Sequence, residues 1–273
     1  MNDLSRATLL FFTTHLRRSL ASRRTLFLLA FSLLPGAVAW CMARFAQRLA
    51  ASEIATLVGW LLFLQIVLPS TALVGGTAVI AEEVEDRTIT YLFTRPIHRV
   101  SLLLGRWLAT LVVLSAVLSI GAGFVVWSAT QPALAVASNA RHALAPPASR
   151  VLGEGIALPL LQAALMGALV YSALFSIAGV IFKHPMIVGV AYAFVIEGFL
   201  ASLPGRNQAL TIQFYLRSWI AAHGSDAWSR VEGFAGGGFD APHNVVVTLG
   251  AIWLGALLFG GWRLSRREFV LTS

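Results

Sequence analysis

Charged side chains are concentrated in the segment Ala81–Arg99, which holds four acids and three arginines. Such groups could transfer protons, bind a cation or orient a partner protein. The stretch between Ile89 and Phe93 is apolar, and Pro96 ends any helix that these residues form. The pattern predicts either a short helix that docks onto another protein or a solvated turn whose apolar part rests on a bilayer.

A second acid, Glu197, lies inside the apolar run Phe194–Phe199. An ionisable group within a membrane segment is by default a candidate functional residue. Glu197 could line a transport pathway or a gate at an interface between two copies. Alternatively, its carboxylate could pair with a nearby arginine or reach a water-filled outer vestibule, with only a structural role. The amides of Gln65 and Gln162 are weaker candidates, expected to form hydrogen bonds between helices.

The composition requires that these groups be positioned by membrane-spanning helices. The 273 residues are 58% hydrophobic and 12% charged, with a mean hydropathy of +0.78. Soluble domains have about 45–50% apolar and about 25% charged residues, so an ordinary soluble enzyme and a disordered chain are excluded. The net charge of +8 fits basic residues at helix ends better than a nucleic-acid partner. With one cysteine, Cys41, the chain forms no internal disulfide.

We therefore predict an all-α integral membrane protein with six transmembrane helices. A crossing needs about 20 mostly apolar residues, and none of the candidate segments alternates as a barrel strand would. The six predicted segments are Thr25–Ala43, Ile54–Ala81, Trp107–Ala129, Ile156–Phe182, Met186–Leu203 and Val245–Trp262.

The basic residues predict the orientation of this bundle. Thirteen of them lie at one set of helix ends and seven at the other, so both termini are expected in the cytoplasm. Residues 1–24 are predicted to form an amphipathic helix on the inner leaflet, or else a basic tail that only sets topology. Residues 25–273 would form a single transmembrane domain. Two external loops are expected: an irregular one at about 131–155, and one at about 204–244 that opens with an apolar-aromatic stretch suited to the membrane interface.

The segment Glu82–Arg99, followed by Leu104-Gly105-Arg106, resembles the first cytoplasmic loop of ATP-binding-cassette (ABC) permeases of the type-2 exporter class. That loop has a Glu-rich helix end, a Gly-Thr step, an Arg-Pro pair and a Gly-Lys or Gly-Arg before the third helix. Here Arg87-Thr88 replaces the commoner Gly-Thr. The six segments, the basic amphipathic start and the large loop after the fifth segment extend the resemblance along most of the chain.

The resemblance implies a permease subunit of an export-type transporter in a bacterial inner membrane, surrounded by lipid. Its loop would contain the coupling helix that docks on an ABC-type ATPase subunit. The residues implied in coupling are Glu82, Glu83, Glu85, Arg87, Thr88, Tyr91, Leu92, Phe93, Arg95 and Pro96.

The lysine content separately predicts that ATP is bound by a partner. A Walker A motif needs Gly-Lys-Ser/Thr, and the only lysine, Lys183, lies between Phe182 and His184. We expect no catalytic, cofactor or metal residues in this chain, with ATP and Mg on the ATPase partner. Two such partners would imply a second permease copy or a paralogue.

Two other functions must be weighed. Glu82, Glu83 and Arg87 also match the Glu-Glu-x-x-x-Arg signature of intramembrane metalloproteases of the prenyl-endopeptidase type. That chemistry needs histidines from later membrane helices. All the later histidines fall in loops or at predicted helix ends: His98, His142, His184, His223 and His243. An ion-coupled secondary carrier usually needs several intramembrane ionisable groups, and only Glu197 is present.

Overall fold

A computed structural model describes residues 3–45, 51–85, 99–139, 155–202, 206–224 and 239–266. Within these ranges the regular structure is entirely helical, without a strand, which confirms the all-α prediction. In chain order the elements are α1 (Asp3–Leu20), α2 (Arg23–Phe45), α3 (Ala51–Val58), the π-helix η1 (Gly59–Val67), α4 (Leu68–Glu85), α6 (Arg99–Asn139), α8 (Ala157–Ile181), α9 (Pro185–Val190), the π-helix η2 (Ala191–Glu197), α10 (Gly198–Ser202), the 3₁₀ turn η3 (Arg206–Leu210), α11 (Ile212–His223) and α13 (Pro242–Arg266).

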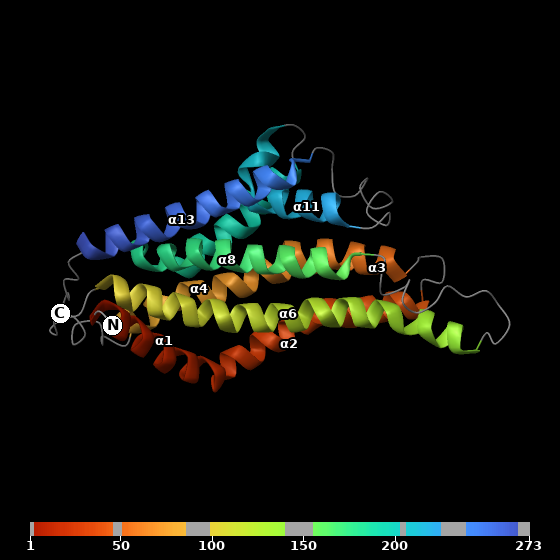
Figure 1. The fold of residues 1–273 in the computed structure, drawn as a ribbon, viewed down its shortest axis with the longest axis horizontal. Helices are drawn as coiled ribbons and strands as arrows, with labels where there is room; N and C mark the ends of the chain where they lie inside the picture. Colours follow the sequence, from red (N-terminus) through yellow and green to blue (C-terminus); the bar gives the residue numbers. More distant parts are fainter. Residues whose placement is uncertain are drawn as a thin grey trace.

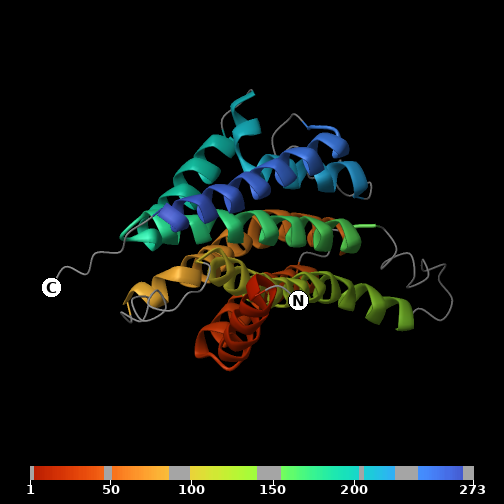
Figure 2. The ribbon, with the colours of Figure 1, turned by 60° about the vertical axis from the view of Figure 1, so that its left-hand side comes forward.

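The elements form three layers, visible in Figure 1 and from a second direction in Figure 2. The middle layer contains α4, α6 and α8. On one side α1 and α2 form a V that packs against α6, and on the other α11 and α13 pack against α8. Each outer layer therefore packs mainly on a different helix of the middle layer, one on α6 and the other on α8.

The predicted crossings coincide with the observed helices. Among the described residues, five helical stretches are long and apolar enough to cross a membrane: Arg23–Phe45, Ala51–Val79, Ser101–Gln131, Ala157–Ile181 and Pro242–Leu264. The fifth predicted segment corresponds to α9, η2 and α10, an apolar helix shorter than these. The second and fifth segments each contain a π-helical stretch, a form that is rare and frequent at functional sites.

The start of α1, the end of α4, the start of α6 and the end of α13 lie at the same end of the molecule (left in Figure 1). This arrangement agrees with the prediction that the two termini and the segment 82–99 share one side. We call this end the inner end and the opposite one the outer end.

The two predicted external loops need correction. The first does not begin at Gln131, because α6 continues through Pro132 to Asn139. Proline removes one backbone hydrogen bond, but the Ala- and Leu-containing sequence after it favours helix. The second, 204–244, is not merely an interfacial loop, since it contains α11, whose residues Ile212, Leu216 and Ile220 are buried in the protein.

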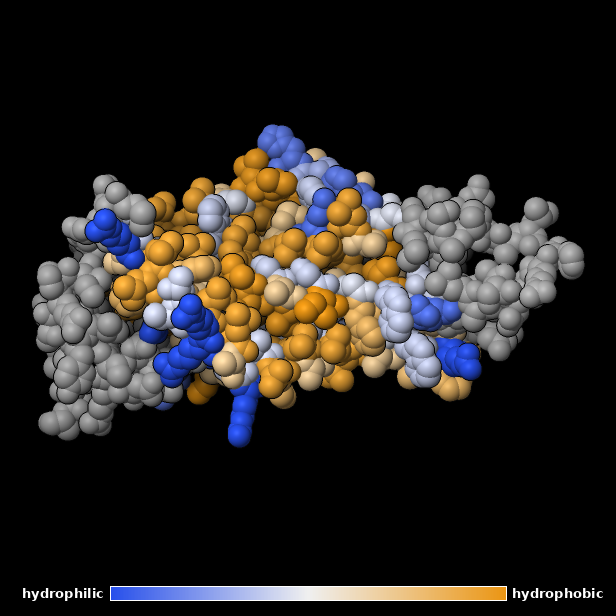
Figure 3. Space-filling view, turned by 60° about the horizontal axis from the view of Figure 1, so that its bottom comes forward, coloured by the Kyte–Doolittle hydropathy of each residue, from blue (hydrophilic) through white to orange (hydrophobic). Residues whose placement is uncertain are grey.

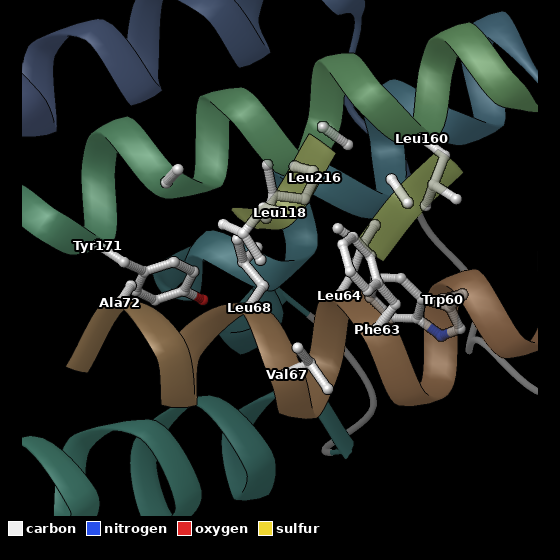
Figure 4. Close-up of a cluster of buried hydrophobic side chains, with 14 of the residues drawn as sticks. Trp60, Phe63, Leu64, Val67, Leu68, Ala72, Leu118, Leu160, Tyr171 and Leu216 are labelled. Atoms are coloured by element: carbon white, nitrogen blue, oxygen red, sulfur yellow. The ribbon is translucent and has the colours of Figure 1, made fainter. Parts of the chain in front are cut away.

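The core lies between η1, α4, α6, α8 and α11. Figure 4 shows one buried hydrophobic cluster that includes Phe63 and Leu64 of η1, Leu118 of α6, Leu160 of α8 and Leu216 of α11. All five side chains are almost fully buried. Because α11 contributes to the same cluster as the crossing helices, it is an integral part of the bundle.

Candidate functional site

The predicted coupling segment begins on the last turn of α4. Glu82, Glu83 and Glu85 belong to this helix, which ends at Glu85. The other predicted coupling residues lie outside the described residues: Arg87, Thr88, Tyr91, Leu92, Phe93, Arg95 and Pro96. The structure therefore describes the two helix ends that flank the segment, the last turn of α4 and the first turns of α6. We call these two helix ends the base of the coupling segment.

The two sides of this base are connected. Arg106, near the start of α6, donates a hydrogen bond from Nη1 to the backbone oxygen of Val79 in α4, at 3.3 Å. Next to it, Gly105 allows α1 to approach α6 closely, because a Cβ added there would lie 2.6 Å from the backbone oxygen of Thr8. The Gly-Arg pair near the start of α6 thus connects α4, α6 and α1.

The second predicted site, Glu197, ends η2 and is 2% exposed. Its Oε1 accepts hydrogen bonds from the hydroxyl of Tyr192 and the backbone N–H of Ile212, both at 3.0 Å. Its Oε2 accepts from the backbone N–H of Gln213 at 3.1 Å. Both carboxylate oxygens are therefore engaged by the chain itself.

Glu197 meets the first turn of α11. Thr211 is the N-cap residue, and its hydroxyl accepts from the backbone N–H of Phe214 at 3.2 Å. The first N–H groups of a helix have no partner within the helix, and the helix dipole places partial positive charge there. A carboxylate at this position satisfies these groups, so Glu197 fastens α11 to the fifth segment.

Gln213 extends this contact to the second crossing. Its side-chain amide donates to the backbone oxygen of Leu64, in η1, at 2.7 Å. The start of α11 thus connects the two π-helical stretches, η1 through Leu64 and η2 through Glu197. We call the group Leu64, Tyr192, Glu197, Ile212 and Gln213 the α11 junction.

Aromatic and cationic side chains surround the junction. Tyr171 stacks on Phe175, which meets the ring of Tyr192 edge-on at 6.1 Å between centroids. One turn further along α11, Arg217 is buried and donates to Oε1 of Gln208 at 2.7 Å. Burial lowers the pKa of Arg217, whose guanidinium carbon lies 5.5 Å from the ring centroid of Phe214.

The two predicted sites are separate. The acids that end α4 lie at the inner end, whereas Glu197 contacts α11, which Figure 1 places toward the outer end. The hydrogen-bond partners found for Glu197 are a tyrosine and two backbone amides rather than an arginine. The carboxylate does not face an open pathway in this conformation, because it is almost fully buried.

A metalloprotease centre finds no counterpart in the part of the chain that the structure describes. No group of three His, Cys, Asp or Glu side chains is close enough there to hold a metal ion. His223 ends α11 and His243 lies in the first turn of α13, both exposed. They are therefore not gathered around the acids at the end of α4.

A family model of ABC-2 family transporter proteins matches residues 7–204, which is more than half of the chain. The chain belongs to the ABC-2 transporter family. It is therefore a multi-pass membrane permease of an ABC transporter. The match covers α1 through α10, so it includes the base of the coupling segment and Glu197 but not α11. No curated protein sequence matches the permease significantly.

The sequence did not predict that α11 is a buried helix that brings the residues of the α11 junction together. The permease buries Gln213 and Arg217 in a segment that we expected at the membrane interface. The apolar spacing of Ile212, Leu216 and Ile220, after Thr211 as a possible N-cap, is a helical signal that could have revealed α11. The partner of Gln213 could not be found this way, because Leu64 is 149 residues away.

Proposed function

We propose that this permease is the transmembrane subunit of an ATP-driven exporter and is coupled through residues 82–99 to a separate ATPase. Family membership supports the transport role, and export follows from the resemblance to the type-2 exporter class. The bacterial inner membrane is the location that this class implies. ATP and Mg would be bound by the ATPase, and a second permease copy or a paralogue would complete the transporter.

The observation that carries the coupling proposal is the connected base of the segment. Arg106 ties α6 to α4 at Val79, and Gly105 seats α1 against the same turn of α6. A force applied to a segment between these helices would reach three helices together. A loop anchored in this way suits the transmission of an ATPase movement to the membrane helices.

Truncation of the apolar part of the segment tests this proposal. Tyr91→Ala and Phe93→Ala should each weaken co-purification of the ATPase by about 1–3 kcal/mol, or roughly 5- to 150-fold in affinity, because buried aromatic side chains dominate such interfaces. Glu83→Gln and Arg95→Gln should affect affinity less and coupling of ATP hydrolysis to transport more. Phe45→Ala is the matched control, since this aromatic residue ends α2 and is 82% exposed.

The experiment also separates the alternatives. A metalloprotease would require Glu82 and Glu83 for peptide cleavage, would tolerate loss of Tyr91 and Phe93, and would bind no ATPase. An ion-coupled carrier would transport without an ATPase. Recovery of the active chain alone from its native membrane in mild detergent would contradict the coupling proposal.

We also propose that Glu197 belongs to a gate at the outer part of the transport pathway. The support is its position: one carboxylate holds α11 to η2, and Gln213 holds the same turn of α11 to η1. Movement of the fifth segment would then be transmitted to α11 and the second crossing. This role differs from that of a residue that contacts the transported molecule.

A further inference from the structure

Tyr171 of α8 is a buried polar residue beside the α11 junction, and its hydroxyl has no hydrogen-bond partner among the described residues. Its side chain is fully buried, and in Figure 4 the ring extends from α8 into the core next to Ala72. The groups that act on this hydroxyl include the carboxylate of Glu197 and the side chain of Gln213. An unpaired buried hydroxyl raises the free energy of the conformation that contains it, so an acceptor within reach would be used.

The surroundings of the junction favour an acceptor from the protein itself. Tyr171 lies in the middle of α8, which is long and apolar enough to cross the membrane. The face of the molecule in Figure 3 is largely hydrophobic between its two ends. A polar group at membrane depth must be satisfied within the protein, because hydrocarbon does not form hydrogen bonds. Glu197 is the anionic acceptor that acts on the Tyr171 hydroxyl.

Tyr171 and the start of α11 both belong to the buried centre of the bundle. The ring of Tyr171 stacks on Phe175 at 5.9 Å between centroids. Gly76 of α4 packs closely on the same part of α8, because a Cβ added there would lie 2.8 Å from Cβ of Phe175. At the start of α11, Ile212 is buried in the core cluster. Two elements next to Glu197, α8 and α11, are therefore held by core packing.

Glu197 itself is carried by a peripheral element. In η2 only Ala193 and Glu197 are buried, whereas Phe194 and Val195 are 54% and 61% exposed. The π-helix lies between two short α-helical pieces, so a change from π to α winding would turn Glu197 about the helix axis. A Cβ added to Gly198 would meet nothing within 4 Å, so the space beside the end of η2 is open.

From this arrangement we propose that Tyr171 is a second hydrogen-bond partner of Glu197, which the carboxylate reaches when η2 turns away from the first turn of α11. In the observed conformation Glu197 accepts from the backbone N–H groups of Ile212 and Gln213. In the second conformation the Tyr171 hydroxyl donates to the carboxylate, which recovers part of the hydrogen bonding that is lost at α11. The inference rests on the gate proposed above and supplies its second position.

The test measures the position of η2 relative to α11 in the full-length permease, reconstituted in lipid nanodiscs. The exposed Cys41 is replaced by alanine, and spin labels are attached to cysteines at the exposed positions Val195 of η2 and Ala222 of α11. Double electron–electron resonance then gives the distribution of distances between the labels. Two conformations of η2 appear as two distances, and their ratio is the quantity compared between variants.

Ile212→Pro removes one donor of Glu197 without interrupting α11. Ile212 is the first residue of the helix, where proline is tolerated, and Thr211 before it already has the extended backbone that proline favours. Ile212→Ala is the matched control, because it also removes the buried side chain but keeps the N–H group. We expect the proline variant to raise the second population at least about tenfold and the alanine variant less than about threefold, since a hydrogen bond to a charged group is lost only in the first.

Tyr171→Phe identifies the partner in the second conformation. Added to Ile212→Pro, it should reverse most of the increase, because the second conformation then lacks its donor. Alone, it should leave the unfolding temperature unchanged or raise it, since it removes no hydrogen bond from the observed conformation. Tyr192→Phe should lower that temperature, because the Tyr192 hydroxyl already donates to Glu197.

Three results would overturn the proposal. Equal increases in the proline and alanine variants would mean that core packing, rather than the N–H group of Ile212, holds η2. A second distance that persists after Tyr171→Phe would assign Glu197 another partner. An unfolding temperature lowered by Tyr171→Phe as much as by Tyr192→Phe would show that the hydroxyl is already bonded, directly or through a water, in the observed conformation.

The gate and the exchange of partners fail in different measurements. If Glu197 belongs to a gate but does not exchange partners, Glu197→Gln loses transport while the label distances stay the same in every variant. If the exchange occurs without a gate, the distances change as described while Glu197→Gln transports normally.

Discussion

The α11 junction and the turn between α1 and α2 are both polar regions in an apolar bundle, and they differ in how far their charged groups are buried. At the junction, the carboxylate of Glu197 is 2% exposed and receives three hydrogen bonds from the chain. At the turn, Arg18 is exposed and Arg24 is half-buried, and both lie beside a cavity of about 200 Å³. A buried charge is tolerated only when it is paired or hydrogen-bonded, so the fold depends more on the hydrogen bonds of Glu197 than on the charges of the turn.

The comparison also assigns different consequences to the two regions. Loss of a hydrogen-bonded carboxylate leaves buried backbone donors without a partner, and this cost falls on the folded state. Loss of a cationic side chain at the solvent-accessible turn should cost less, because the contacts of exposed charged groups contribute little to stability. Variants at the junction should therefore lower stability more than charge variants at the turn.

The largest effect is expected for Glu197→Gln. An amide has one acceptor and one donor end, so in either orientation its NH₂ group faces a backbone N–H, of Ile212 or of Gln213. We expect the permease to be destabilised by about 2–4 kcal/mol, since hydrogen bonds to a charged group contribute about 1.5–3 kcal/mol each. Thermal unfolding in detergent measures this loss.

A transport assay distinguishes a role of Glu197 in gating from a purely structural role. If Glu197 belongs to a gate, the Gln variant should lose transport at temperatures where it is still folded and still activates the ATPase. Wild-type transport by a folded Glu197→Gln protein would leave the carboxylate with a structural role alone. An unchanged unfolding temperature would show that the junction does not stabilise the fold.

A smaller effect is expected where α1 packs on α6, for Gly105→Ala. The added Cβ would lie 2.6 Å from the backbone oxygen of Thr8 and 2.9 Å from Cβ of Phe11, so α1 must move away from α6. Overpacking of this kind costs about 1–3 kcal/mol. Faster proteolytic cleavage within α1 would report this movement.

Gly123→Ala is the matched control in the same helix. Nothing lies within 4 Å of the Cβ that it would add. Because alanine favours helix over glycine by about 1 kcal/mol, this variant should be neutral or slightly more stable. Equal behaviour of the two alanine variants would mean that close packing of α1 on α6 is not important.

The sequence predicted the membrane-spanning helices more accurately than it predicted these two polar regions. Apolar length and basic helix ends are local signals, so the crossings and the shared inner end of the chain could be expected. The ends of elements were less accurate: α6 runs past Gln131 to Asn139 because helix propensity outweighs one proline.

The candidate site depends on contacts between distant segments, which local sequence signals do not reveal. Glu197 was recognised because a carboxylate within an apolar run is unusual, but its partners Ile212 and Gln213 belong to α11, which was not expected as a buried helix. In the turn between α1 and α2, Arg18 and Arg24 belong to the thirteen basic residues that predicted the orientation of the bundle. Their arrangement around a cavity depends on Thr110 and Val113 of a distant helix, and this proximity is a property of the fold.

The smallest effect is expected for Tyr192→Phe, which removes one of the three hydrogen bonds to Glu197 and keeps both backbone ones. We expect a loss of about 1 kcal/mol, the usual value for a single side-chain hydrogen bond. Tyr215→Phe is the control, because the Tyr215 hydroxyl donates to the backbone oxygen of Ala209 at 2.9 Å and does not bind the carboxylate. Both variants should unfold at similar temperatures.

The double variant Tyr192→Phe with Glu197→Gln then tests whether the junction acts as a unit. Residues in one hydrogen-bond network give non-additive effects, of about 0.5–3 kcal/mol, whereas Tyr215→Phe should add independently to Glu197→Gln. If the junction is a gate, Tyr192→Phe should also alter transport while Tyr215→Phe does not, at equal stability. Additive effects for both tyrosines, with equal transport, would reduce the junction to a set of separate contacts and remove the basis for assigning it a role in gating.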